Sequence, residues 1–108
     1  MTAISTHVLD TSAGRPAAGI TVALEARDGE GWRELGRAIT DADGRARDLA
    51  GAVGATPGIH RLVFGTAAHL GPGAFFPEVS VTFAVAGEDH LHVPLLLSPF
   101  GYSTYRGS

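Results

Sequence analysis

The stretch ITVALEAR, residues 20–27, alternates apolar and polar side chains with a period of two. Successive side chains of a β-strand point to opposite faces, so this stretch predicts a strand with one buried face. The residues DGEG at 28–31 are typical of a turn, and WRELGRAI at 32–39 indicates the returning strand. We therefore expect residues 20–39 to form a β-hairpin.

Short strands of the same kind are expected along the rest of the chain. Turn residues recur roughly every 8–12 positions, which favours a β-sandwich or barrel over an alternating strand–helix fold. The segment GTAAHLGPG at 65–73 indicates one or two helical turns, and residues 1–108 are expected to form a single domain. The further expected strands are ISTHVLD (4–10), GIHRLVF (58–64), VSVTFAVA (79–86), HLHVPLLL (90–97) and a final strand within YSTYR (102–106).

The composition excludes several classes of function. The eight basic residues are all arginines scattered among 11 acidic residues, and a net charge of -3 argues against nucleic-acid binding. The absence of lysine excludes Schiff-base chemistry, and the absence of cysteine excludes disulfides, thiolate nucleophiles and cysteine-ligated metals. No apolar run approaches the ~20 residues of a membrane span. The first ten residues do not resemble a secretory signal, so we expect no membrane partner and a cytoplasmic location.

Two histidines near the end of the chain share one strand face. His90 and His92 are separated by one residue, so on a strand both project from the same side. Imidazole suits zinc and copper, and a metal site is therefore one interpretation. A zinc site needs three or four ligands, and the sequence shows no matching pattern of partners. The other interpretation is a pair of surface or interface histidines.

The remaining candidates are isolated in the sequence. His7 lies within the apolar strand at 4–10, where a single histidine is typically structural, and Arg45 follows a turn where arginine is typically solvated. His60 and His69 are expected to be surface or packing residues. Residues 94–108 stay apolar and aromatic to the end, unlike most chain termini. This pattern predicts an ordered final strand, and a strand edge of this kind suggests a subunit interface.

Four blocks together resemble one known family. They are STHVLDTSAGRPAAGI (5–20), ITDADGR (39–45), FFPEVSVTF (75–83) and HVPLLLSPFGYSTYRGS (92–108). In this order and spacing they resemble the 5-hydroxyisourate hydrolases, the transthyretin-related enzymes of urate degradation. The terminal Tyr-Arg-Gly-Ser at 105–108 is the most specific block, because the related thyroxine carriers lack it.

The resemblance implies a fold and an assembly. The expected fold is an all-β, transthyretin-like (prealbumin-like) sandwich of two four-stranded sheets with one short helix between late strands. The expected assembly is a homotetramer, a dimer of dimers, with active sites in a channel at the dimer–dimer interface. The family uses no metal or other cofactor. This chain departs from it at Leu91, where an aromatic residue is usual, and at His69-Leu70, where Tyr-Phe is usual.

The resemblance also implies a reaction and its residues. The expected reaction is hydrolysis of 5-hydroxyisourate to 2-oxo-4-hydroxy-4-carboxy-5-ureidoimidazoline, by attack of water on a lactam. We assign His92 as the base, His7 as the group that orients water or substrate, and Arg45 as the clamp on the ring and the oxyanion. Tyr105 and Ser108 are expected to close the pocket. The division of labour between His7 and His92 is open at this stage.

Three alternatives belong to other functional classes. A transthyretin-type carrier would bind a small aromatic molecule in the same channel without chemistry, and would need neither the three site residues together nor the terminal block. A metal-binding β-domain would use His90 and His92. A purely structural sandwich module would leave the charged channel residues unexplained.

Overall fold

The alternating stretch at 20–27 forms β3 (Thr21–Asp28), an inner strand of a four-stranded antiparallel sheet. It pairs with β4 (Gly31–Ile39) in the predicted hairpin, with a β-bulge after Leu24, and on its other side with β6 (Gly58–Phe64). The strand β7 (Val79–Val85) completes the order β4-β3-β6-β7. The structure is a computed structural model that describes residues 1–107.

The second sheet is organised around β1 (Ala3–Asp10). On one side β1 pairs in parallel with β8 (His90–His92) and then with β9 (Leu95–Ser98), and β10 (Gly101–Thr104) forms the edge beyond β9. On its other side β1 pairs with the short strands β2 (Arg15–Pro16) and β5 (Arg45–Ala46). The strands β8 and β9 lie end to end along one side of β1, and β5 and β2 lie end to end along the other side. The six segments therefore occupy four strand positions.

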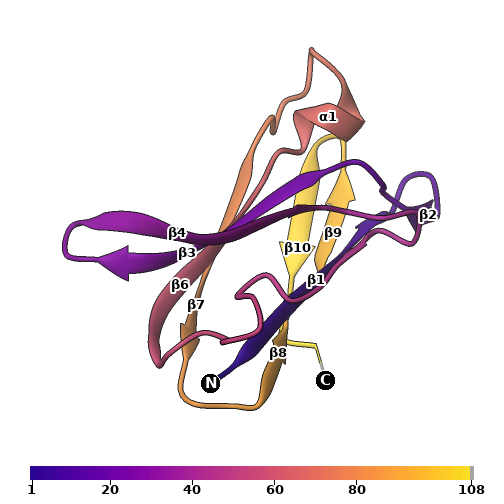
Figure 1. Ribbon diagram of the computed structural model, residues 1–108. Coiled ribbons are helices and arrows are strands. Elements are labelled where there is room, and N and C mark those ends of the chain that lie inside the picture. Colours follow the sequence, from indigo (N-terminus) through magenta and orange to yellow (C-terminus); the bar gives the residue numbers. More distant parts are fainter. Residues whose placement is uncertain (108) are drawn as a thin grey trace.

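The predicted strand at 90–97 is therefore interrupted. The break falls at Val93 and Pro94, between β8 and β9. Proline has no backbone N–H and cannot donate to a sheet ladder, which accounts for the gap. With two packed sheets and one short helix, the predicted all-β, transthyretin-like sandwich is confirmed (Figure 1).

The apolar faces of the two sheets form one core between them. Period-two alternation places Ile4 and Val8 of β1 against residues of the other sheet. Strands of both sheets contribute large, fully buried apolar side chains, which include Ile4, Val8, Val22, Leu24, Leu62, Phe64, Val79, Leu95 and Leu97. His60 also faces this core, where it is 2% exposed and stacks against Phe83. It is a packing residue.

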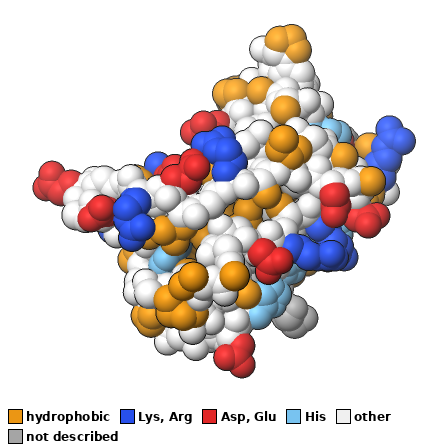
Figure 2. Space-filling model, viewed as in Figure 1, with side chains coloured by type: hydrophobic (Ala, Val, Ile, Leu, Met, Phe, Trp, Pro, Cys, Tyr) orange, Lys and Arg blue, Asp and Glu red, His pale blue; other side chains and the backbone are white. Residues whose placement is uncertain are grey.

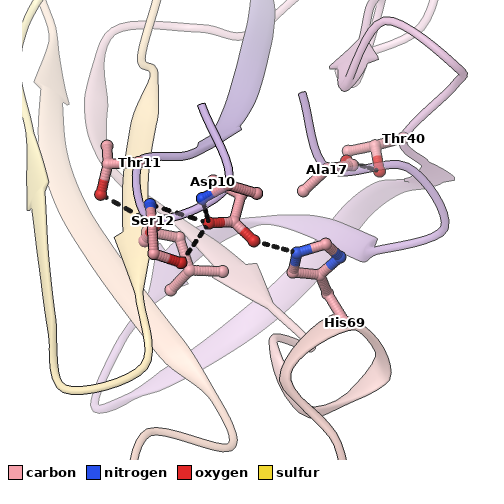
Figure 3. A network of polar contacts seen from close by, with 8 residues as sticks. Asp10, Thr11, Ser12, Ala17, Thr40 and His69 are labelled. Atoms are coloured by element: carbon pink, nitrogen blue, oxygen red, sulfur yellow. Dashed lines mark hydrogen bonds and ion pairs between the residues drawn. The ribbon is translucent and has the colours of Figure 1, made fainter. Parts of the chain in front are cut away.

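The predicted helix at 65–73 is a single turn, α1 (Ala67–Leu70), between β6 and β7. Within residues 1–107 no helix is long and apolar enough to cross a membrane. His69 of α1 reaches the end of β1, where its Nε2 lies 2.6 Å from Oδ2 of Asp10 (Figure 3). The other carboxylate oxygen of Asp10 accepts hydrogen bonds from the backbone N–H of Ser12 and of Ala13 and from the Ser12 hydroxyl.

This network ties α1 to the turn that follows β1. The hydrogen bond from His69, with those from Ala13 and Ser12, holds the pKa of the Asp10 carboxyl well below its usual range. The carboxylate therefore stays charged in the folded protein at neutral pH. His69 is an anchor for α1, a role that its position in the sequence did not indicate.

Replacing Asp10 by alanine should destabilise the fold by about 1–3 kcal/mol, the cost of leaving partners of a charged group unsatisfied. Chemical denaturation at pH 7 measures the difference. Because the pKa of Asp10 is lowered on folding, the advantage of the wild type should be complete above the ordinary carboxyl pKa of about 3.9 and shrink as the pH falls below it. The control is Asp28→Ala, since Asp28 is exposed and its ion pair with Arg33 spans 3.9 Å. Equal stability of the two variants would contradict the role of the network.

Candidate active site

The outward face of β1 carries the polar residues of the site. Along β1, Ile4 and Val8 point into the core, whereas Ser5 and His7 lie on the opposite face. Parallel pairing with β8 sets Ser5 beside His92, and antiparallel pairing with β5 sets His7 beside Arg45. Three of the predicted site residues, His7, Arg45 and His92, are thus brought together from distant parts of the chain.

A tight turn before β5 positions Arg45. Oδ1 of Asp41 accepts hydrogen bonds from the backbone N–H of Asp43, at 2.9 Å, and of Arg45, at 3.0 Å. Gly44 has a positive φ of 75°, and a Cβ on it would lie 2.4 Å from the carbonyl oxygen of Val8. Only glycine fits this conformation and this close approach, which lets the turn join the edge of β1.

A cleft of about 240 Å³ runs across β1 from β8 to β5. In Figure 2, arginine and histidine side chains adjoin on the lower part of the face shown. Neither Arg45 nor Arg47 forms an ion pair with a carboxylate of residues 1–107. The cleft can therefore offer unpaired guanidinium groups to an anionic or strongly polar ligand. It is lined by Ala3, Ile4, Ser5, Thr6, Arg45, Arg47, Asp48, His90 and His92.

The electrostatics of the cleft favour a neutral His92. Burial of the ring lowers the pKa of His92, and the positive charges of Arg45, His7 and His90 lower it further. An imidazole with a pKa below its ordinary value of about 6.5 is unprotonated at pH 7 and can accept a proton. His7 is half-buried, and its Nε2 is buried without a hydrogen-bond partner among residues 1–107.

The C-terminal segment returns to His92 after β10. The backbone N–H of Gly107 donates to the carbonyl of His92 at 2.8 Å, and a Cβ on Gly107 would lie 2.7 Å from Cδ2 of the ring. Glycine is needed at this contact. Tyr105 lies elsewhere, in an apolar groove that Phe83 and Leu91 also line. Ser108, the last predicted site residue, lies outside the described residues.

Sequence reasoning missed Ser5, which lies at the centre of the cleft. Its hydroxyl oxygen is 2.8 Å from Nε2 of His90 and 2.8 Å from Nδ1 of His92. The only local signal is that Ser5 shares a strand face with His7, two residues on. Its proximity to β8 depends on pairing between the two ends of the chain, which no local pattern reveals.

The structure gives no ligand set for the metal interpretation. Within the described residues, no group of three or more His, Cys, Asp or Glu side chains could hold a metal ion. His90 and His92 bond to the Ser5 hydroxyl, and their ring centroids are 6.4 Å apart.

Comparison with known proteins identifies the family. The sequence model of the HIUase/Transthyretin family matches residues 4–107. The chain belongs to this family. It is 47% identical to a 5-hydroxyisourate hydrolase of Caulobacter vibrioides over 116 residues, covering all of both chains. The resemblance seen in the sequence blocks is confirmed.

The similar solved structures include both a 5-hydroxyisourate hydrolase and a transthyretin. The structure of Klebsiella pneumoniae 5-hydroxyisourate hydrolase superposes with a TM-score of 0.84, at 40% identity, over the whole of both chains. Sea bream transthyretin in complex with thyroxine superposes with a TM-score of 0.87, at 28% identity, over 96% of this chain and 93% of that one. Overall shape therefore does not separate a 5-hydroxyisourate hydrolase from a thyroxine-binding transthyretin, and function has to be argued from the side chains of the site.

Replacing Arg45 by glutamine should raise the pKa of His92 toward its ordinary value, because it removes a positive charge that disfavours the imidazolium. Titration of the imidazole resonances by NMR measures this shift directly. The matched control is Arg33→Gln, because Arg33 is an exposed arginine on β4, in the other sheet. The account of His92 is wrong if its pKa is the same in the Arg45 variant and in the wild type.

Proposed function

We propose that this protein hydrolyses 5-hydroxyisourate to 2-oxo-4-hydroxy-4-carboxy-5-ureidoimidazoline, in the degradation of urate. The observation that carries the proposal is the juxtaposition, in one cleft, of a histidine with a lowered pKa and an arginine that has no ion-pair partner within residues 1–107. A carrier needs neither group for binding alone. The names of the similar hydrolases from Caulobacter and Klebsiella supply the substrate.

In the proposed mechanism, His92 takes a proton from water as the water oxygen bonds to the lactam carbonyl carbon. General-base assistance of this kind contributes roughly 10²–10⁴-fold to the rate. The guanidinium of Arg45 stabilises the negative charge that develops on the carbonyl oxygen. The tetrahedral intermediate then collapses, the ring C–N bond breaks, and the imidazolium of His92 returns its proton to the leaving nitrogen. The products are a ureido group and a carboxylic acid, which loses its proton to solvent to become the carboxylate.

His7 lies next to Arg45 and is proposed to orient the water or the substrate. The contact of Gly107 with His92 supports a role for the C-terminal segment in shaping the pocket. We propose that Ser108 completes the pocket from this segment.

Tyr105 is 55% exposed in the neighbouring groove, and its role in binding substrate remains a prediction. The reaction as written uses no metal or other cofactor.

The direct test is catalysis itself. A urate oxidase generates 5-hydroxyisourate in the cuvette, and the ultraviolet decay of the compound is followed with and without the protein. We expect a large acceleration. Spontaneous decay at an unchanged rate would refute the proposal, and the carrier alternative would then be tested by binding of small aromatic ligands.

Alanine at His92 or at Arg45 should lower kcat with little change in KM, because both groups act mainly in the transition state. Loss of one group that stabilises an oxyanion costs about 10²–10³-fold, and we expect this for Arg45. The matched controls are His69→Ala and Arg33→Ala, which alter residues that do not line the cleft and should retain nearly full kcat. Similar losses in all four variants would contradict the assignment of the site.

We also propose that the protein is a homotetramer, a dimer of dimers. Phe75 is 68% exposed and Phe100 is 82% exposed, and their ring centroids are 6.4 Å apart beside the turn between β9 and β10. An exposed aromatic cluster next to an edge strand is typical of a subunit interface. A second pair of chains facing the outer side of β1 would enclose the cleft.

Light scattering should therefore report a mass near that of four 11.1 kDa chains. Phe100→Asp should lower this mass, because it places a charge in the proposed interface. Val53→Asp is the control, since Val53 is also exposed, at 73%, but lies outside the aromatic cluster. A fully active monomer would contradict the proposed assembly.

A further inference from the structure

Ser5 holds two imidazole rings at once. Its hydroxyl oxygen lies 2.8 Å from Nε2 of His90 and 2.8 Å from Nδ1 of His92. The pairing of β1 with β8 produces this arrangement by setting Ser5 beside His92 and Ala3 beside His90. The proposed mechanism gives no role to Ser5 or to His90, although both line the cleft.

The number of available hydrogens restricts how these contacts can be made. A serine hydroxyl has one hydrogen and two acceptor lone pairs, so it can donate to at most one of the two imidazoles, and a ring to which it does not donate must itself donate to it. When Nδ1–H of His92 donates to Ser5, Ser5 either donates to Nε2 of His90 or accepts from it as well, and in both cases Nε2 of neutral His92 has no hydrogen. In the reverse arrangement, His90 donates to Ser5 and Ser5 donates to Nδ1 of His92. Nε2 of His92 then carries the hydrogen and cannot act as a base.

We propose that Ser5 and His90 are positioning residues that hold neutral His92 as its Nδ1–H tautomer, so that Nε2 accepts the proton of the attacking water. The inference rests on the proposed hydrolysis and deepens it. Donation from Nδ1 of His92 to Ser5 suits both protonation states of His92, because the imidazolium must also donate from Nδ1. Proton transfer then proceeds without reversing either hydrogen bond.

The surroundings of the two rings also favour donation of a hydrogen bond from Nδ1 of His92 to Ser5. His92 is half-buried, whereas His90 is exposed, so the remaining N–H of His90 can be hydrated by solvent. Arg45 on β5, whose charge lowers the pKa of His92, has a guanidinium that can only donate hydrogen bonds, and His7 lies beside it on β1. Within residues 1–107, the Ser5 hydroxyl is the hydrogen-bond partner of Nδ1 of His92.

The first test needs no substrate. In protein labelled with ¹⁵N at histidine, the nitrogen shifts of neutral His92 should show a protonated Nδ1 and an unprotonated Nε2. Ser5→Ala should give a mixture of tautomers, and Ser5→Thr, which keeps the hydroxyl, should restore the wild-type shifts. A protonated Nε2 in the wild type, or wild-type shifts in Ser5→Ala, would overturn the proposal. Because this measurement uses no substrate, it tests the tautomer of His92 whether or not the protein hydrolyses 5-hydroxyisourate.

The second test separates positioning from binding. Ser5→Ala and His90→Leu should each lower kcat about 10-fold, the effect of losing one hydrogen bond, and change KM by less than about 2-fold. Ser5→Thr and His90→Gln keep the hydroxyl and an acceptor, and should recover most of kcat. The matched control is Ser98→Ala, whose hydroxyl bonds to Gly101 at the turn between β9 and β10. Unchanged kcat in both loss variants, or equal losses in Ser5→Thr and Ser5→Ala, would overturn the proposal.

Discussion

The parallel pairing between β1 and the line of β8 and β9 is the constraint on which the rest of the structure depends. It joins an N-terminal strand to two C-terminal strands and fixes which side chains of β1 point into the core and which point outward. Ile4 and Val8 face the shared core, whereas Ser5 and His7 face outward beside His92. One strand therefore contributes both to stability and to the site, and a shift of its register by one residue would exchange the two faces.

The electrostatic character of the site follows from that pairing. His90 shares β8 with His92, and β1 and β5 bring His7 and Arg45 to it. Burial and positive charge act on the pKa of His92 in the same direction. Gly44 and Gly107 allow two backbone segments to approach more closely than any side chain would permit. The cleft is thus formed by backbone segments that pack tightly around β1 and carry a few polar side chains.

Much of the fold could be predicted from local patterns. Period-two alternation indicated the strands at 4–10, 20–27, 58–64 and 79–86, and the DGEG turn indicated the hairpin. The break at Pro94 divides a strand that hydropathy alone predicts as continuous. The positions of Ser5 and of the contact between Asp10 and His69 could not be predicted, because each depends on register between segments far apart in the chain. The roles of His7, Arg45 and His92 came from the family resemblance rather than from any pattern in the residues.

The most direct test of the cleft as the active site is a crystal structure of the protein with urate bound as a stable ring analogue. The account predicts that the purine ring lies across β1, with a carbonyl oxygen within hydrogen-bond distance of the Arg45 guanidinium and the ring edge facing His92. Urate bound instead in the apolar groove beside Tyr105 and Phe83, with the cleft free of ligand, would contradict it.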